Sequence, residues 1–207
     1  MRIRHRGEEP QVDPSAYVAP TAVLAGRVLV GPRARVLFGA VLNAEGSTIE
    51  IGECSIVSEN AVIRASGGEG ARYPVTVGEH VLIGPHATLL GCTIESFSYV
   101  AAGAAVLKGA VVRSGCVVGV GAAVFSESVV PAGMFLPPNT IAIGDPTDIY
   151  SPDEKVTLAS YIKTLRFGNI VPGGDSAEER RSLLKRATEE RAREYESHFG
   201  DIVVEEE

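Results

Sequence analysis

An aliphatic residue recurs at every sixth position over most of this chain of 207 residues. The spacing is interrupted near residues 43–50 and again at 66–72, and the step that leads to Ile94 is five residues long. A helix repeats every 3.6 residues and a half-buried strand every 2, so neither produces this period. The series comprises Val12, Val18, Leu24, Val30, Val36, Leu42, Ile51, Val57, Ile63, Val77, Ile83, Leu89, Ile94, Val100, Val106, Val112, Val118, Val124, Val130 and Leu136.

A sustained period of six is typical of a parallel β-helix, in which each unit is a short strand with a corner and three units make one triangular coil. Successive coils stack about 4.8 Å apart through backbone hydrogen bonds, with the aliphatic residues pointing inward. Tryptophan is absent and aromatic residues make up 6% of the chain, which suits a thin interior of small side chains. We therefore expect a mainly β protein with a β-helix domain over residues 1–149. The repeat does not fix the handedness of the helix.

Beyond Leu136 the hexad pattern stops, and residues 150–207 are predicted to form a C-terminal helical segment. The run Ser-Pro-Asp-Glu at 151–154 supplies an N-cap, a proline at the first helical position and a glutamate at the third, so a helix should begin there and reach about residue 166. A second, densely charged helix is expected over 176–200, as a solvated helix or a subunit-contact arm. The acidic tail 205–207 is expected to be disordered.

The bulk composition narrows the classes of partner. The formal net charge of −7 disfavours a nucleic-acid partner, because like charges repel. The basic start of the sequence has no apolar region behind it, and no run is long enough to span a membrane, so we expect a cytoplasmic protein without a membrane partner. Cys54, Cys92 and Cys116 form no disulfide framework and are interpreted as structural.

Several short motifs carry a resemblance to a known family. Residues 73–94 contain Tyr-Pro, regularly spaced glycines and Gly-Cys-Thr-Ile, and Ile51-Gly52 and Gly119-Val120-Gly121 agree as well. On these motifs, residues 12–146 resemble the γ-class carbonic anhydrases, a family of hexapeptide-repeat proteins. The resemblance implies a left-handed β-helix, a C-terminal helix packed along its side, and a homotrimer with sites between subunits.

The metal ligands of that family are replaced here. The family binds zinc through three histidines, and the matching positions of this chain hold Arg64, Pro85 and Leu90. Zinc needs imidazole, thiolate or carboxylate donors, and none of these three side chains supplies one. Without a metal there is no route to a hydroxide at neutral pH, which CO2 hydration requires. No zinc cofactor is therefore predicted, and carbonic anhydrase activity by the family mechanism is not expected.

The hexad register places Arg64 and Leu90 on one face, one coil apart, and Pro85 on the neighbouring face. The family's Arg-Gly-Asp reads Asn43-Ala44-Glu45 here, and its Gln-Asp reads Ser58-Glu59. We hypothesise that Arg64 pairs with Glu45 or Glu59 across the trimer interface, either as a structural bolt or as a pocket for a small anion. The candidate polar site therefore comprises Asn43, Glu45, Ser58, Glu59, Arg64 and His86.

The four histidines give little further signal. His80 and His86 occupy the same hexad place on neighbouring faces and are interpreted as corner or surface residues. His5 and His198 lie in terminal segments and suggest no function. A one-residue shift turns a strand side chain to the other side, so His86 does not inherit the ligand role of its neighbour Pro85.

Three functions from different classes remain open. The first is a trimeric binding or assembly module related to carbonic anhydrase. The second is a hexapeptide acyltransferase that uses a histidine base and an acyl-CoA. Its difficulty is Asp145 and Asp148, which place negative charge where the pyrophosphate of coenzyme A would need positive charge. The third is an enzyme with a metal site rebuilt from Glu45, Glu59 and His86.

Overall fold

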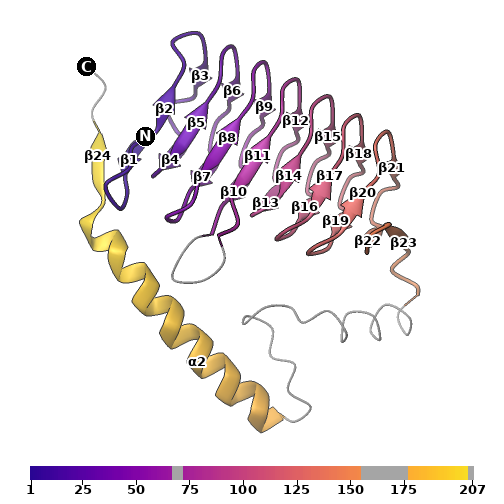
Figure 1. Cartoon of the computed structure of the whole chain (residues 1–207). Helices are drawn as coiled ribbons and strands as arrows, with labels where there is room; N and C mark the ends of the chain where they lie inside the picture. Colours follow the sequence, from indigo (N-terminus) through magenta and orange to yellow (C-terminus); the bar gives the residue numbers. More distant parts are fainter. Residues whose placement is uncertain (67–71, 155–176, 205–207) are drawn as a thin grey trace.

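A computed structural model describes residues 1–66, 72–154 and 177–204. Short strands stack along one axis, and each coil contributes one strand to each of three sheets in the described part (Figure 1). Apart from the two outermost pairings, the strands run parallel. The mainly β fold and the parallel β-helix predicted from the hexads are confirmed.

The strands of the three sheets are as follows. One ten-stranded sheet has the order β23 (Asp148–Tyr150), β22 (Ile141–Ile143), β19 (Ala123–Val124), β16 (Ala105–Val106), β13 (Thr88–Leu90), β10 (Val62–Arg64), β7 (Val41–Asn43), β4 (Val23–Ala25), β1 (Arg2–Arg4) and β24 (Ile202–Val204). A second sheet has the order β2 (Gln11–Val12), β5 (Val28–Val30), β8 (Ile49–Ile51), β11 (Val75–Val77), β14 (Thr93–Ile94), β17 (Val111–Val112) and β20 (Val129–Val130). The third has the order β21 (Phe135–Leu136), β18 (Val117–Val118), β15 (Tyr99–Val100), β12 (Leu82–Ile83), β9 (Ile56–Val57), β6 (Arg35–Val36) and β3 (Tyr17–Val18).

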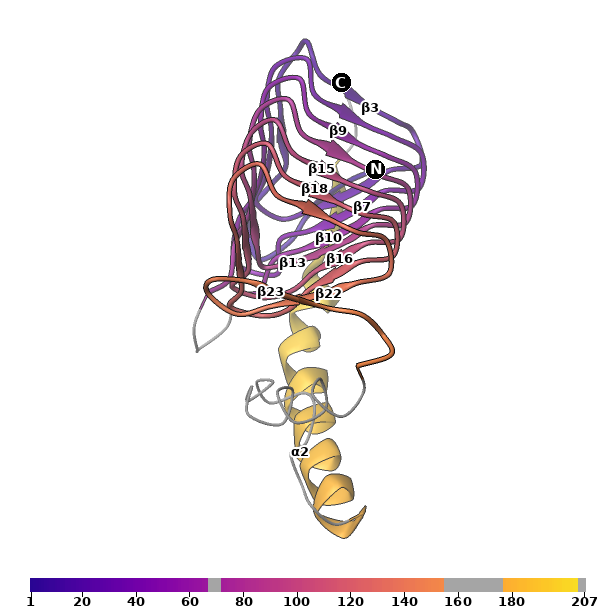
Figure 2. The same ribbon diagram turned by 90° about the vertical axis from the view of Figure 1, so that its right-hand side faces the viewer.

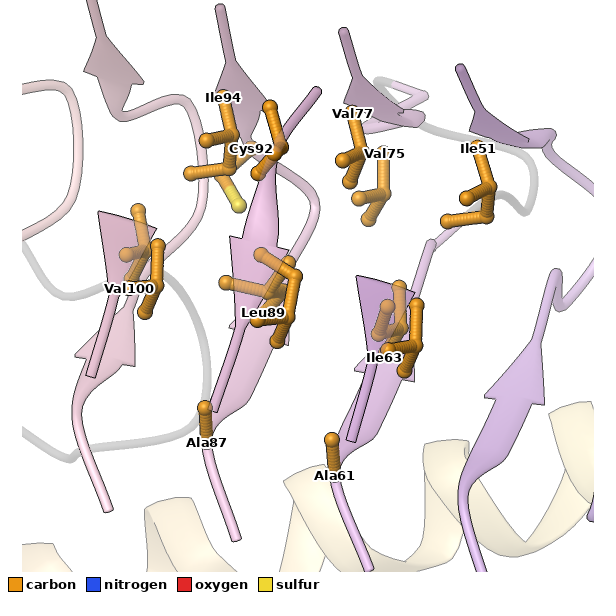
Figure 3. Packing of buried hydrophobic residues seen from close by; sticks show 14 of the residues in the cluster. Ile51, Ala61, Ile63, Val75, Val77, Ala87, Leu89, Cys92, Ile94 and Val100 are labelled. Carbon is orange, nitrogen blue, oxygen red and sulfur yellow. The ribbon is translucent and has the colours of Figure 1, made fainter. Parts of the chain in front are cut away.

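The hexad residues form the core, stacked one above another. Ile63 of β10 pairs with Leu42 of β7 on one side and with Leu89 of β13 on the other, and all three side chains are fully buried. Figure 3 shows the same stacking for the aliphatic residues of the neighbouring sheet, which point toward Ile63 and Leu89 across the narrow interior. A single coil would leave its aliphatic side chains without a neighbouring coil above and below, so the stability of the fold comes from the stack as a whole.

The close approach of successive coils explains why certain positions hold glycine, and the sharp corners explain why other residues have a left-handed backbone. A Cβ added to Gly52 would lie 2.4 Å from the carbonyl carbon of Gly78 on the next coil, so the position excludes any side chain. The corners themselves use left-handed backbone, with φ values of 53° at His80 and 57° at His86. Both histidines are exposed at these corners, as the hexad register predicted.

The C-terminal segment differs in part from the prediction. The charged helix expected over 176–200 is present as α2 (Ala177–Tyr195), followed by a 3-10 helix, η1 (Glu196–Gly200). It does not pack along the side of the coils, as the family resemblance implied, but extends away from them in both views (Figures 1 and 2). No helix in the described ranges combines the length and the apolar character that crossing a bilayer requires.

The other predictions for this segment concern residues that lie partly or wholly outside the described ranges. The helix expected over 151–166 falls outside them after residue 154, although the Ser151 N–H does donate to the Glu154 carboxylate at 2.7 Å, which is half of a capping box. The tail 205–207 also lies outside them. The division between domains at 149/150 stays a prediction, and β23 runs across it.

Both ends of the ten-stranded sheet are closed by antiparallel strands. At the C-terminal end, β23 folds back on β22. At the N-terminal end, β24 pairs with β1, with Arg2 opposite Val204 and Arg4 opposite Ile202. The strand β24 was not predicted, because a strand of three residues beyond a charged helix has no hexad neighbour to indicate it.

Candidate functional site

The candidate site begins with the column of side chains that the register predicted. Arg64, the last residue of β10, lies between Asn43 of β7 and Leu90 of β13 in the ten-stranded sheet. The prediction that Arg64 and Leu90 share one face, one coil apart, is therefore confirmed. Pro85 is exposed beyond the end of β12, on the adjoining side of the prism.

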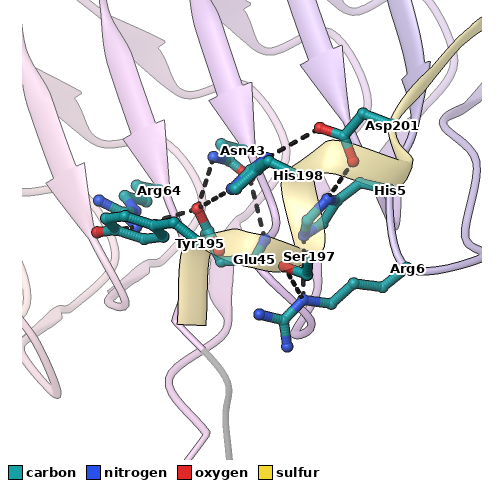
Figure 4. A network of polar contacts seen from close by, with 9 residues as sticks. All are labelled: His5, Arg6, Asn43, Glu45, Arg64, Tyr195, Ser197, His198 and Asp201. Carbon is teal, nitrogen blue, oxygen red and sulfur yellow. Dashed lines mark hydrogen bonds and ion pairs between the residues drawn. The ribbon is translucent and has the colours of Figure 1, made fainter. Parts of the chain in front are cut away.

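Glu45 is the acceptor at the centre of the site (Figure 4). Its side chain is only 7% exposed, and its backbone takes a left-handed φ of 45°, steadied by an N–H···O hydrogen bond of 3.1 Å to the Asn43 side chain. One carboxylate oxygen, Oε1, accepts three hydrogen bonds from Asn43 Nδ2 at 3.0 Å, Arg64 Nη2 at 3.0 Å and His198 Nε2 at 3.1 Å. Such charge-assisted bonds keep a buried carboxylate ionised.

Arg64 pairs with a carboxylate of its own chain. The hypothesis placed Glu45 or Glu59 of a neighbouring subunit opposite the guanidinium, whereas here Glu45 of the same chain occupies that place. Arg64 Nη2 also donates to Tyr195 Oη at 2.8 Å, and the guanidinium carbon lies 5.3 Å from the centre of that ring. The contact between Arg64 and Tyr195 thus links the β-helix to the end of α2.

The C-terminal segment brings two further ionisable groups to Glu45. His198 of η1 faces Glu45 through Nε2 and Asp201 Oδ2 through Nδ1, the latter at 2.9 Å. The other oxygen of Asp201 lies 2.6 Å from Nδ1 of His5, whose side chain is fully buried next to β1. The two imidazole rings stack with centroids 4.3 Å apart. Glu45, His198, Asp201 and His5 therefore form one continuous chain of hydrogen bonds (Figure 4).

The partners of each ring fix its protonation state. Arg6 Nε donates to His5 Nε2 at 3.1 Å, and because an arginine cannot accept, Nε2 carries the lone pair and Nδ1 the proton. His5 thus donates to Asp201 through Nδ1. His198 faces a carboxylate oxygen with each nitrogen, and it can donate to both only as an imidazolium.

The electrostatics agree with this assignment. Partial burial works to lower the pKa of His198, but the bonds to Asp201 and Glu45 outweigh it and raise the pKa above its ordinary 6.5. Burial works to raise the pKa of Glu45, but the His198 bond and the Arg64 charge hold it below 4.5. The pKa of Asp201 likewise lies below 3.8, because the bonds from His5 and His198 exceed the effect of burial.

A metal ion does not suit these residues. At the three positions that match the family's zinc ligands, Arg64 is a cation already paired with Glu45, and Pro85 and Leu90 have no donor atom. Donor atoms of His5, His198 and Asp201 do lie within 4.8 Å of one another. However, His5 Nδ1 carries a proton there, and two rings stacked at 23° do not aim their lone pairs at one point. A hydrogen-bonded ion network is what this geometry supports.

The remaining predicted site residues stand apart from this network. Ser58 is buried, Glu59 half-buried and His86 exposed. Glu59 and His86 lie side by side on adjacent coils, where the His86 N–H donates to the Glu59 carbonyl at 3.0 Å. Within the described residues of one chain, no side-chain hydrogen bond or ion pair joins these three residues to Glu45. Among the same residues, Glu45, Glu59 and His86 do not form a group whose ligand atoms are close enough to hold one metal ion.

The residues that sequence reasoning missed are those of the two termini. His5 and Asp201 are separated by 196 positions, and neither belongs to the hexad pattern. The one signal was weak: Arg-Ile-Arg at 2–4 and Ile-Val-Val at 202–204 are each compatible with a short strand. Pairing those strands would have placed His5 beside the end of the charged helix.

Comparison with known proteins relates the chain to the family that its motifs suggested. No family model matches the sequence. Gamma carbonic anhydrase 1 of Arabidopsis thaliana is 33% identical over 100 residues, which cover 47% of this chain and 36% of that protein. Gamma carbonic anhydrase-like 1 of the same plant is 39% identical over 88 residues, covering 42% of this chain and 35% of that protein. The chain thus matches little more than a third of the length of these curated relatives.

A solved structure extends the comparison to the fold. A hexapeptide transferase family protein from Anaplasma phagocytophilum superimposes with a TM-score of 0.52 at 22% identity, over 93% of this chain and 95% of that one. This likeness concerns the fold alone, and it identifies the solenoid as a left-handed β-helix. The chain is therefore a left-handed β-helix protein that is similar, over nearly half its length, to the γ-class carbonic anhydrases and their carbonic anhydrase-like relatives.

Proposed function

We propose that this protein is a γ-carbonic-anhydrase-like homotrimer that binds no zinc, hydrates no CO2 and serves as a binding or assembly module. The observation that carries the proposal is the ion pair of Arg64 with Glu45, 3.0 Å long, at a position that matches a zinc ligand of the family. A guanidinium repels a divalent cation and cannot be deprotonated to ligate one. A cytoplasmic location stays part of the proposal.

The ligand of such a module would be an anion or another small molecule at the subunit interface. The Arg64 side chain is 33% exposed although it is paired, so part of it stays accessible. Planar anions such as carboxylates match the fork of an arginine. The nearby face, with Leu90, Leu107 and Phe125 half-buried along the column, would contribute apolar contact.

Metal content and activity test the first part of the proposal. The purified chain should contain no stoichiometric zinc after growth in zinc-supplemented medium, and stopped-flow measurement should find no acceleration of CO2 hydration above buffer. Light scattering should give three times the 21.7 kDa of one chain. Zinc at one ion per subunit interface together with rapid hydration would refute the proposal.

A gain-of-ligand variant sharpens the test. Arg64→His, Pro85→His and Leu90→His combined would supply three imidazoles at the matching positions, so this variant should bind zinc where the natural sequence does not. Arg64→His alone is the matched control, since one imidazole with Pro85 and Leu90 leaves the ligand set incomplete. If the triple variant trimerises and still excludes zinc, the assignment of these positions to the family's site is wrong.

The acyltransferase alternative rests on the fold alone. Asp145 and Asp148 are exposed in the segment that leaves the β-helix, where their charge would repel the pyrophosphate of coenzyme A. The structural likeness to a hexapeptide transferase family protein does not extend to residues of a site. Calorimetric titration with acetyl-CoA separates the two functions: saturable binding with a 1:1 stoichiometry would favour the transferase.

A further inference from the structure

The contact between the β-helix and the C-terminal segment depends on the proton of one imidazole. His198 offers Nε2 to Glu45 and Nδ1 to Asp201, at 3.1 and 2.9 Å. A neutral imidazole has one N–H and one lone pair, so it can satisfy only one of these carboxylates and turns its lone pair toward the other. Removing the proton therefore replaces one of two attractive contacts by repulsion.

In the described part of the chain, polar contacts and one short strand pairing hold this segment. None of the residues 196–204 is fully buried, and Phe199, Ile202 and Val203 are 92%, 54% and 57% exposed. Apolar burial, the main source of stability elsewhere in the molecule, contributes little here. What remains is the short β1–β24 ladder and the polar network around His198.

The charged groups that face this network come from every element packed against it. From the β1 side, Arg6 donates to His5 Nε2 and also to Ser197 Oγ at 3.2 Å. From the β-helix, the cation Arg64 and the carboxylate Glu45 face the ring; from the C-terminal segment, Asp201 and the phenol Tyr195 do. Glu45 has the Arg64 guanidinium as a second charged partner, whereas Asp201 is bonded by the His5 and His198 rings.

We propose that His198 is a pH-dependent latch: as an imidazolium it joins Glu45 of the β-helix to Asp201, and loss of its proton releases residues 196–204 from the first coils. The docked segment closes the N-terminal edge of the ten-stranded sheet, and Tyr195 covers Arg64 only while the segment is docked. The latch thus exposes both the edge of β1 and the guanidinium of Arg64 when it opens.

The pH range follows from the three groups. His198 gains its proton more readily in the docked state, so its contribution is complete below the ordinary value of 6.5 and is lost as the pH rises through the higher docked-state value. Glu45 and Asp201 lose their protons more readily in the docked state. Their contributions to docking are therefore complete above about pH 4.5 for Glu45 and about pH 3.8 for Asp201, and they disappear at lower pH. Docking should be tightest between these limits and weaken on both sides.

Hydrogen exchange on the full chain measures the latch. Protection factors of amides 202–204, corrected for intrinsic exchange at each pH, should fall roughly three- to tenfold between about pH 6 and about pH 8.5, while those of β10 stay constant and report the intact coils. In His198→Gln, which can donate to only one carboxylate, protection should be low at both pH values. His80→Gln, which alters an exposed corner histidine outside the network, should respond like the natural sequence.

The titration of His198 itself provides a second, independent measurement. Its ring resonances should titrate above pH 6.5, in step with the exchange of β24. Constant protection of 202–204 across this range would overturn the latch, and so would a fall that persists in His198→Gln while β10 stays protected.

Discussion

The two ends of the ten-stranded sheet are closed by the same device, an antiparallel strand, but by different chemistry. At the C-terminal end β23 follows β22 after a short turn, and Ala142 and Ile143 beneath it are buried. At the N-terminal end β24 arrives from the far end of the chain. It is as exposed as β23, but ionised groups next to it join the C-terminal segment to the coils. Apolar burial is nearly indifferent to pH, whereas an imidazolium between two carboxylates is not. A change of pH should therefore weaken the closure of the N-terminal end and leave that of the C-terminal end unchanged.

The largest expected effect concerns the C-terminal end. Ile143→Ala removes a fully buried side chain under β23 and should lower the free energy of unfolding by about 2–5 kcal/mol, equally at pH 6 and pH 8. Urea denaturation at the two pH values measures it. Ile149→Ala, in β23 itself and 39% exposed, is the matched control and should cost much less. If Ile143→Ala lowered the free energy of unfolding by different amounts at the two pH values, the C-terminal end would also depend on pH, and the proposed difference between the two ends would be wrong.

The next effect concerns the buried histidine of the N-terminal end. His5→Ala removes the 2.6 Å partner of Asp201 and one of the acceptors of Arg6, so the chain should lose about 1–3 kcal/mol of stability. Denaturation midpoints compared with those of His80→Ala, which alters an exposed corner histidine, measure the loss. Equal midpoints for the two variants would mean that the network adds nothing to the N-terminal closure.

A smaller effect is expected on the acid side. The docked pKa of Asp201 lies below 3.8, so its contribution to docking is complete above that value and is lost as the pH falls further. Asp201→Asn cannot ionise, so its docking should be weaker by about 1 kcal/mol near pH 6 and should change less between pH 4 and pH 2.5. Exchange of amides 202–204 over this range tests the difference. Parallel acid profiles for the two chains would contradict it.

The smallest effect concerns Tyr195. Tyr195→Phe removes the hydroxyl that accepts from Arg64 at 2.8 Å but keeps the ring beside the guanidinium, so docking should weaken by about 0.5–1 kcal/mol at pH 6. The same exchange measurement detects it as a decrease in protection of less than tenfold. The pH response should survive, because His198 keeps both of its carboxylates. A lost pH response would shift the latch from His198 to the phenol.

Sequence reasoning succeeded where a side chain's place is set by repetition. The hexads predicted the stacked core and put Arg64 beside Leu90, because every coil repeats the geometry of the one below it. The same reasoning named Glu45 as a partner of Arg64 but assigned the pair to two chains. Nothing in the repeat signals that a carboxylate two residues beyond β7 turns back toward β10.

The rest of the site could not be predicted for a physical reason. His198 reaches Glu45, and Asp201 reaches His5, only after α2 and η1 have carried the chain back to β1, and no periodic pattern determines where an exposed helix returns. His5 and His198, for which the sequence suggested no function, lie stacked on each other within the network. Contacts between distant, non-repeating segments are the part of such a fold that composition and period leave open.

The pairing of β24 with β1 has a practical consequence for handling the protein. A β-helix that loses its terminal strand presents a row of free N–H and C=O groups, and such a row accepts a strand from any other copy. If His198 controls that strand, alkaline buffers would free the edge of β1 beside the edges of β2 and β3, and the end of the stack would become a seed for end-to-end growth. Concentrated stocks kept slightly acidic would then remain uniform, and turbidity would rise first in those left at high pH.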